Sequence, residues 1–600
     1  MRAERPNRAT TPGFSRGPFE WRWLSCAVVA ACITGCSPVA AQVAARDSLP
    51  SPAIIRYDSI HHPVVARYGM VVSQNVLASQ IGRKILEDGG NAVDSAIAVG
   101  FALAVTLPRA GNLGGSGFML VHMAETNETV ALDYRSMAPA GLDLDAIRDS
   151  EGNVDRRQIN FGPLAPGVPG TVAGLYEAWQ RFGSLPWNEL VEPAVELAAS
   201  GIRVTDDLAF ALANAAPVMS IYPASVDAYL KPDGTPYAAG EHLVQPKLAW
   251  SLRAIRDGGA DAFYRGPIAE RIASNLGADG GVITLSDLDS YRVRVREPIA
   301  GTYRDHRVLT MPPVSGGGIT LVQMLKVLEH FDLKALGPGS AQTLHIMAET
   351  MKQSAANRRI TIGDPDFVDV PVRGYISDAL ASTLAARIEP DGVTPVADIT
   401  PTNALPYESR ETTHYSVVDR HGNAVSNTYT LGASFGSGYV VPETGILLDN
   451  QIRNFTYGQK GHANSIAPGK RMVSTMTPTI VLAPDGEVLL VTGTPGGSRI
   501  INVILQVIVN VVEHGMNVAE ATHAPRIHQQ WRTPNLGVER GISIDAIALL
   551  EKMGHVVEQQ QTMGSTQSIV SRDGLLYGSA DPRRPGALAV GVHTLAPNDE

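Results

Sequence analysis

The most informative segment of this chain of 600 residues lies deep inside it and reads Thr412-Thr413-His414-Tyr415-Ser416-Val417-Val418-Asp419. Its alternating pattern and β-branched residues predict a strand. If the bond before Thr412 were cut, this residue would own both a nucleophilic hydroxyl and an α-amine that takes its proton. This interpretation predicts a precursor that cleaves itself between Glu411 and Thr412. The alternative is a threonine in an ordinary strand, where β-branched residues are common.

The chain after Thr412 is organised as two hairpins followed by a glycine turn. The strand pattern recurs in each hairpin, at 414–419 and 424–431 and then at 479–482 and 488–492. The last strand runs into Gly493-Thr494-Pro495-Gly496-Gly497-Ser498-Arg499, and a helix is expected from near Ile500. Glycine N–H groups beside a helix N-terminus suit a carboxylate, a phosphate or a developing oxyanion. A plain tight turn is the alternative.

The chain before Thr412 mixes helices with short strands. Two helices joined by a glycine turn are predicted within 79–107, and helical patterns dominate 166–275 and 340–360. A strand at 129–134 delivers Arg135, and residues 303–310 are predicted as another strand. Residues 390–407 are polar and Pro-rich, which is typical of an exposed linker that tolerates cleavage.

Other catalytic motifs fit the sequence poorly. Gly432-Ala433-Ser434-Phe435-Gly436 satisfies the G-x-S-x-G pattern of serine hydrolases, but that motif needs a helix after the serine, and Ser437-Gly438-Tyr439-Val440-Val441-Pro442 cannot start one. No cluster of His, Cys and carboxylate residues has zinc spacing, and no acidic run has calcium-loop spacing. We therefore predict neither a catalytic metal nor a cofactor.

Composition excludes several classes of protein. Apolar residues make up 44% of the chain and charged residues 18%, which allows a large buried core. The formal charge is 49 − 59 = −10 without a long basic run, so nucleic acid is not an expected partner. All 3 cysteines lie in the first 36 residues, so disulfides and thiolate catalysis are excluded from the rest.

The N-terminus predicts export. The apolar stretch from Leu24 to Thr34 is too short to span a bilayer, which needs about 20 residues, and suits a signal peptide. Ile33-Thr34-Gly35-Cys36 resembles a bacterial lipobox, whereas Val39-Ala40-Ala41 offers an ordinary cleavage site. The signal peptide is therefore 1–41, or 1–35 if Cys36 is lipidated and attaches the protein to a membrane. We expect a periplasmic protein or an outer-membrane lipoprotein of a bacterium.

Several short motifs occur in a fixed order along the chain, in addition to the stretch from Thr412 to Asp419. They are Asp133-Tyr134-Arg135-Ser136-Met137-Ala138-Pro139, Gly167-Val168-Pro169-Gly170-Thr171-Val172, Met311-Pro312-Pro313, Gly363-Asp364-Pro365-Asp366-Phe367, Thr494-Pro495-Gly496-Gly497-Ser498-Arg499, Met563-Gly564-Ser565-Thr566-Gln567-Ser568 and Asp581-Pro582-Arg583. With these motifs the chain, from about Gly69 to its end, resembles the γ-glutamyltransferase (γ-glutamyl transpeptidase, glutathione hydrolase) family. The stretch from Thr412 to Asp419 resembles the start of that family's small subunit.

The resemblance implies an N-terminal-nucleophile hydrolase fold, an αββα sandwich of two sheets between helical layers. It also implies self-cleavage into a large subunit, 42–411, and a small subunit, 412–600, which together form a heterodimer. By this resemblance Thr412 is the nucleophile, and Thr430 hydrogen-bonds its hydroxyl. Gly496 and Gly497 match the oxyanion-hole glycines, and Arg135 matches the clamp for the substrate α-carboxylate, which Ser474 and Thr475 assist. Gln451, a substrate-binding residue of the family, is retained.

Two departures from the family pattern concern the substrate amine. Gly432 stands where the well-known γ-glutamyl enzymes carry Asn, and Asn454 stands where they have an Asp that pairs with the α-ammonium. Losing that carboxylate removes a charge-assisted hydrogen bond of roughly 1.5–3 kcal/mol. An acyl group without the amine, such as glutaryl, is then rejected less strongly. The segment 455–474 is also shorter than in lid-bearing relatives, which indicates a more open cleft.

We therefore expect an exported, self-cleaving enzyme that transfers the acyl group of γ-glutamyl amides such as glutathione to water, amino acids or peptides. One alternative is an amidohydrolase of the same construction acting on glutaryl groups, in the manner of cephalosporin acylases. The other is an unprocessed lipoprotein that only binds peptides.

Overall fold

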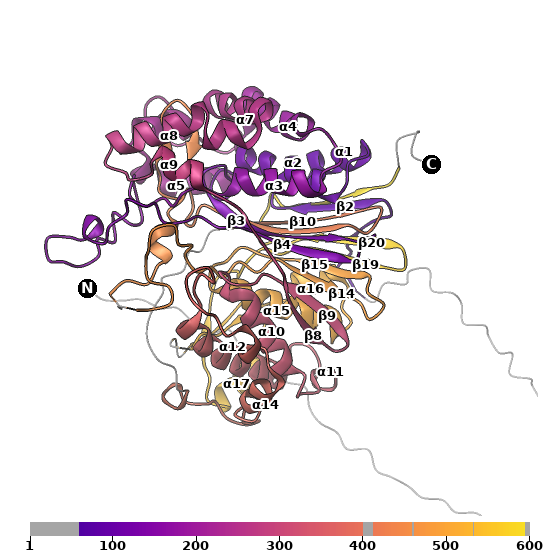
Figure 1. The fold of residues 1–600 in the computed structure, drawn as a ribbon. Helices are drawn as coiled ribbons and strands as arrows, with labels where there is room; N and C mark the ends of the chain where they lie inside the picture. Colours follow the sequence, from indigo (N-terminus) through magenta and orange to yellow (C-terminus); the bar gives the residue numbers. More distant parts are fainter. Residues whose placement is uncertain (1–58, 400–411, 459–460, 532, 534, 595–600) are drawn as a thin grey trace, which may run out of the picture. The chain divides into compact units, whose positions relative to one another are not determined.

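The computed structural model describes residues 59–399, 412–458, 461–531, 533 and 535–594, with side chains left out at 357 and 359–361. The predicted signal peptide, Cys36 and Glu411 lie outside these residues. Within them the chain forms two stacked sheets between two layers of helices, as Figure 1 shows. The predicted αββα architecture is confirmed.

Both sheets have seven strands among the described residues, and all the strand pairs in them are antiparallel. The first sheet has the order β1 (Val64–Ala66), β20 (Leu575–Ala580), β19 (Gln567–Arg572), β15 (Val488–Thr492), β14 (Thr479–Leu482), β9 (His306–Thr310) and β8 (Ile299–Tyr303). The second has the order β21 (Leu588–Val592), β2 (Gly69–Ser73), β10 (Thr413–Asp419), β11 (Ala424–Thr430), β3 (Ser116–Met123), β4 (Glu128–Tyr134) and β7 (Arg294–Arg296).

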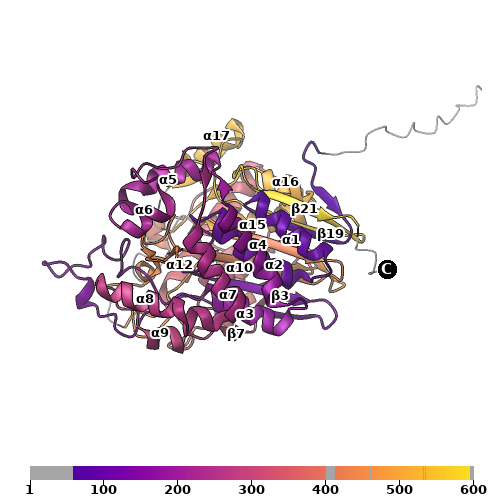
Figure 2. The same cartoon turned by 90° about the horizontal axis from the view of Figure 1, so that it is seen from above.

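One helical layer covers the outer face of the second sheet (Figure 2). Its helices are α1 (Val76–Glu87), α2 (Ala92–Thr106), α3 (Thr171–Phe182), α4 (Trp187–Ser200), α5 (Asp206–Met219), α6 (Pro223–Tyr229), α7 (Pro246–Tyr264), α8 (Pro267–Ala278) and α9 (Leu285–Ser290). The other layer packs on the first sheet and consists of α10 (Gly316–Leu328), α11 (Leu333–Leu336), α12 (Ala341–Thr361), α13 (Val372–Tyr375), α14 (Asp378–Ala385), α15 (Arg499–Val512), α16 (Val518–His523) and α17 (Ile544–Lys552).

Short elements complete the fold. Small sheets join β5 (Ile202–Arg203) with β6 (His242–Leu243), β12 (Val440–Val441) with β13 (Ile446–Leu447), and β16 (Ile527–His528) with β17 (Asn535–Val538) and β18 (Val556–Gln559). The 3₁₀ turns are η1 (Asp145–Ile147), η2 (Val396–Asp398) and η3 (Gln451–Asn454).

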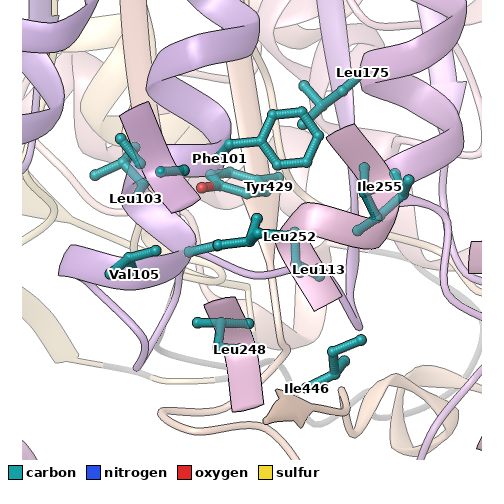
Figure 3. Packing of buried hydrophobic residues seen from close by; sticks show 14 of the residues in the cluster. Phe101, Leu103, Val105, Leu113, Leu175, Leu248, Leu252, Ile255, Tyr429 and Ile446 are labelled. Atoms are coloured by element: carbon teal, nitrogen blue, oxygen red, sulfur yellow. The ribbon is translucent and has the colours of Figure 1, made fainter. Parts of the chain in front are cut away.

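Strand alternation explains why the central strands are buried on both faces. In β2, Val71 belongs to the core under the first helical layer, whereas Met70 and Val72 belong to the core shared with the first sheet. Helix α2 is buried along its whole length and packs Phe101 and Leu103 beside Tyr429 of β11, as seen in Figure 3. A strand such as β10 therefore holds a rigid position between two packed layers.

One sequence prediction is wrong. Residues 303–310 were predicted as a single strand, but the structure divides them between β8 and β9. Arg304 and Asp305 have φ of 47° and 66°, so the chain reverses there in a tight hairpin turn. Neither residue is a glycine, and the sequence therefore carries no clear signal for positive φ at this point.

Candidate functional site

Thr412 directly precedes β10, a strand in the middle of the second sheet (Figure 1). It is buried, with 4% of its surface exposed. Its hydroxyl donates a hydrogen bond to Oγ1 of Thr430, at 3.4 Å, and the same Oγ1 accepts the N–H of Gly432 at 2.8 Å. Because β10 and β11 are neighbours in antiparallel register, the start of one strand meets the end of the other. The structure thus brings Thr412 and Thr430 together.

The glycine turn lies at the same end of β10. The imidazole of His414 packs against Gly493, where an added Cβ would come within 2.4 Å of the ring. His414 also hydrogen-bonds Thr428 at 2.8 Å, and burial lowers its pKa to about 3, so the ring is neutral. The close approach requires glycine at 493 and places the residues after β15 beside the head of β10. A histidine two residues after the nucleophile candidate therefore positions the turn.

Within this turn, Gly496 and Gly497 have φ of 138° and 57°, a conformation that favours glycine. The carbonyl of Gly497 accepts a hydrogen bond from the hydroxyl of Thr475 at 2.9 Å. Helix α15 begins two residues later at Arg499. The predicted strand, glycine turn and helix are all present, and the turn is fastened to the segment that contains Ser474 and Thr475.

Arg135 follows β4 directly and is 1% exposed. Its Nε donates to the carbonyl of Met472 at 3.2 Å, and an Nη donates to the carbonyl of Val473 at 3.5 Å. Burial lowers the pKa of the guanidinium to about 10, against the opposing effect of Asp449 and Asp133, so the side chain stays charged at neutral pH. These contacts place the cation next to the Ser474 segment and leave it able to bind an anion.

Gln451 and Asn454 open and close the turn η3. The side-chain amide of Gln451 donates to Oγ of Ser116 at 2.7 Å and to the carbonyl of Thr430 at 3.2 Å. Oε1 of Gln451 and Oδ1 of Asn454 are buried and accept no hydrogen bond from a described residue. A buried acceptor without a donor is costly, so both oxygens suit a ligand that brings donors, such as an ammonium group.

The rival serine motif has the wrong surroundings, as the sequence predicted. Gly432 has φ of 94°, and a Cβ there would lie 2.3 Å from Oδ1 of Asn450. Ser434 follows in a turn in which Phe435 and Gly436 also have positive φ, and the next element is the short strand β12 rather than a helix. The serine is not on a nucleophile elbow.

Sequence reasoning missed Asp449, a fully buried carboxylate two residues before Gln451. It accepts hydrogen bonds from the hydroxyl of Ser136 and from the N–H groups of Gly167, at 2.9 Å, and Gln451, at 3.3 Å. Burial raises its pKa to about 6, although these hydrogen bonds and the charge of Arg135 act in the opposite direction. The sequence feature that could have pointed to Asp449 is its position directly after the apolar run Ile446-Leu447-Leu448.

No group of three or more His, Cys, Asp or Glu residues that could hold a metal ion occurs among the described residues. In the same part of the chain, no helix is both long and apolar enough to cross a membrane. The predicted absence of a metal and a cofactor stays a prediction.

Comparison with known proteins agrees with this geometry. Residues 78–591 match the family model described as gamma-glutamyltranspeptidase. The glutathione hydrolase proenzyme of Escherichia coli (strain K12) is 48% identical over 545 residues, which cover 89% of this chain and 93% of that protein. Among solved structures, cephalosporin acylase from Bacillus halodurans superposes with a TM-score of 0.80 at 28% identity, covering 91% of this chain and 100% of that one. Helicobacter pylori gamma-glutamyltranspeptidase gives 0.54 at 41% identity, covering 58% and 97%.

Proposed function

Because the chain belongs to the gamma-glutamyltranspeptidase family, we propose that Thr412 is its nucleophile and that cleavage before Thr412 activates it. The protein is an enzyme, a gamma-glutamyltransferase and glutathione hydrolase made as a proenzyme. The observation that supports Thr412 most directly is its place: a buried hydroxyl at the head of a central strand, hydrogen-bonded to Thr430.

Maturation would cut the bond between Glu411 and Thr412. It yields a large subunit, 42–411, and a small subunit of 600 − 411 = 189 residues, which stay together as a heterodimer. The two subunits share the second sheet, since β10 and β11 of the small subunit lie between β2 and β3 of the large one. The boundary also runs between β2 and β21 and, in the first sheet, between β1 and β20 and between β9 and β14. Separating the subunits would break these five strand ladders and expose apolar cores, so cleavage does not require dissociation.

Once its α-amine is free, that amine takes the proton of the Thr412 hydroxyl as Oγ1 attacks the γ-carbonyl of the donor. Thr430 holds Oγ1 in position. The negative charge that develops on the carbonyl oxygen is stabilised by N–H groups of Gly496 and Gly497. The nitrogen of the scissile amide takes a proton and leaves as an amine, and the acyl group remains on Thr412 as an ester. Water, an amino acid or a peptide then attacks the ester and releases the acyl group.

The donor is held by its α-carbon substituents. Arg135 binds the α-carboxylate with its guanidinium, assisted by Ser474 and Thr475. The unpartnered oxygens of Gln451 and Asn454 accept hydrogen bonds from the α-ammonium. These contacts fix the scissile amide relative to the nucleophile, which lowers the entropic part of the barrier.

Hydrolysis of amine-free acyl groups is a second candidate activity. The neutral Asn454 favours this activity. When the donor has no ammonium group, leaving a buried amide without that partner costs less free energy than leaving a buried carboxylate without it. Gly432 adds no side-chain contact to the amine. A glutaryl amide would still bind Arg135 through its carboxylate.

We also propose that the protein is exported, to the periplasm or as a lipoprotein attached through Cys36. Support comes from the sequence pattern of residues 1–41, which lie outside the described residues.

A denaturing gel of the purified protein tests the proposed maturation. Two fragments are expected, and N-terminal sequencing of the smaller one should begin at Thr412. Thr412→Ala should leave a single inactive chain, whereas Thr412→Ser, which keeps a hydroxyl and an amine, should still be cleaved and retain some activity. A fully active preparation that consists of the intact chain would refute the mechanism.

A further inference from the structure

The carboxylate of Asp449 connects three separate segments of the chain, two of which contain proposed donor-site residues. It accepts hydrogen bonds from Ser136, which follows Arg135, from Gly167 in the loop before α3, and from the backbone of Gln451. None of the three partners carries a charge. The only negative side chain in this group is therefore held within one or two residues of both the carboxylate clamp and the amine contact.

The charged groups around Asp449 are few. Arg135 faces it from the end of β4 and is the charge that acts on it most strongly. Asp133 of β4 lies near two cations, Arg296 at 3.1 Å and Arg471 at 3.6 Å. On the side of η3, Arg453 donates to Oδ1 of Asn160 at 2.7 Å. The arginines stay cationic at neutral pH, so Asp449 is the group in this set whose charge changes there.

Asp449 does not occupy the hydrogen-bond donors of the Arg135 guanidinium. The guanidinium donates hydrogen bonds to two backbone carbonyls, so it keeps a cationic face for a ligand while Asp449 compensates its charge from nearby. With Asp449 ionised, the pair is neutral and matches a zwitterion, the α-carboxylate and α-ammonium of a glutamyl group. With Asp449 protonated, the pair is cationic and matches a carboxylate alone.

We propose that Asp449 is a specificity-determining residue whose protonation state selects between zwitterionic glutamyl donors and anionic donors that lack the amine. This inference rests on the proposed function, because it assumes that Arg135 holds the donor carboxylate.

The switch falls in an accessible range because burial raises the pKa of Asp449 to about 6. Above that pH the carboxylate is ionised and glutamyl donors are favoured; below it the proton is bound and glutaryl donors gain. The ratio of kcat/KM for the two donors should therefore rise by about tenfold between pH 5 and 7, which corresponds to about 1.4 kcal/mol. Titration of the Thr412 amine affects both donors alike and cancels in the ratio.

Two substitutions test the assignment. Asp449→Asn preserves size, since its amide oxygen can accept the two N–H groups and its NH₂ can donate to the Ser136 hydroxyl once that hydroxyl rotates. It should hold the ratio at the low-pH value throughout. Ser136→Ala removes a hydrogen bond to the ionised carboxylate, so it should move the inflection to higher pH and keep its size.

The experiment measures kcat/KM for γ-glutamyl and glutaryl 4-nitroanilides from pH 5 to 7, on wild type, both variants and a control, with two-fragment processing verified on a gel. Asp94→Asn is the control: Asp94 is also fully buried but caps the start of α2, beside the far end of β10 from Thr412, and should leave the wild-type curve unchanged. A flat wild-type ratio, or a wild-type rise retained in Asp449→Asn, would overturn the inference. The inference would also be overturned if the donor ratio of Ser136→Ala changed at the same pH as that of the wild type. Processed enzyme that turns over neither donor would instead contradict the proposed function on which the inference rests.

Discussion

Replacing Asn454 by Asp restores a carboxylate at the place where the donor amine is proposed to bind. Oδ1 of Asn454 is buried and accepts no hydrogen bond from a described residue, so an ammonium would be its donor. A neutral acceptor contributes about 1 kcal/mol to such a contact and a charged one about 1.5–3 kcal/mol. The gain is about 0.5–2 kcal/mol, or about 2- to 30-fold in kcat/KM for a γ-glutamyl donor. The adjacent Arg453 helps to keep the new carboxylate ionised.

The assay compares release of 4-nitroaniline from γ-glutamyl and glutaryl anilides at pH 7.5. The glutaryl rate should fall, because its only charge is a carboxylate that the new Asp repels. Asn454→Ala serves as the matched control: it removes the acceptor without adding charge, so the glutamyl rate should fall while the glutaryl rate changes little. If Asn454→Asp leaves both rates unchanged, the amine is bound elsewhere. If both rates change by the same factor, residue 454 acts on the fold rather than on the amine.

Three further predictions concern the turn, the clamp and acid stability. Gly496→Ala introduces a side chain at φ of 138° and displaces the N–H, so kcat should fall about 10²- to 10³-fold with KM nearly constant; an unchanged kcat would rule out this turn as the oxyanion site. Arg135→Lys keeps the charge but loses the bidentate fork, worth about 1.5–3 kcal/mol, so KM should rise about 10- to 150-fold, and a change confined to kcat would contradict the clamp. Burial by itself would raise the pKa of Asp581, but Arg526 and Arg583 lower it below 3.8. The stabilisation is therefore complete above about pH 4 and lost as pH falls further, so urea midpoints of the wild type should drop below pH 4 and those of Asp581→Asn should depend less on pH there.

Much of the fold follows from local patterns. The hairpin of β14 and β15 and the helix pair α1 and α2 carry apolar periodicity, turn residues and caps that agree with one another, and the structure confirms them. The hairpin of β8 and β9 was missed because its turn uses Arg304 and Asp305 at positive φ, which a sequence pattern does not reveal.

Some residues of the candidate site could likewise be predicted from local sequence, and others could not. The hydroxyl at the head of a strand and the glycines before a helix are local features, so Thr412, Gly496 and Gly497 could be singled out along the chain. Asp449 could not, because its partners Ser136 and Gly167 are 313 and 282 residues away in sequence.

The alternating strands, the glycine turn and the residue types available for acyl transfer follow from the sequence alone, because propensity and periodicity act over a few neighbouring residues. Which of them meet depends on tertiary packing, which brings His414 against Gly493, Thr412 beside Thr430, and Asp449 within the electrostatic influence of Arg135. The charge state of the donor site belongs to the second group. A pKa depends on burial and on charges across space, and both exist only after the sheets and helical layers have packed.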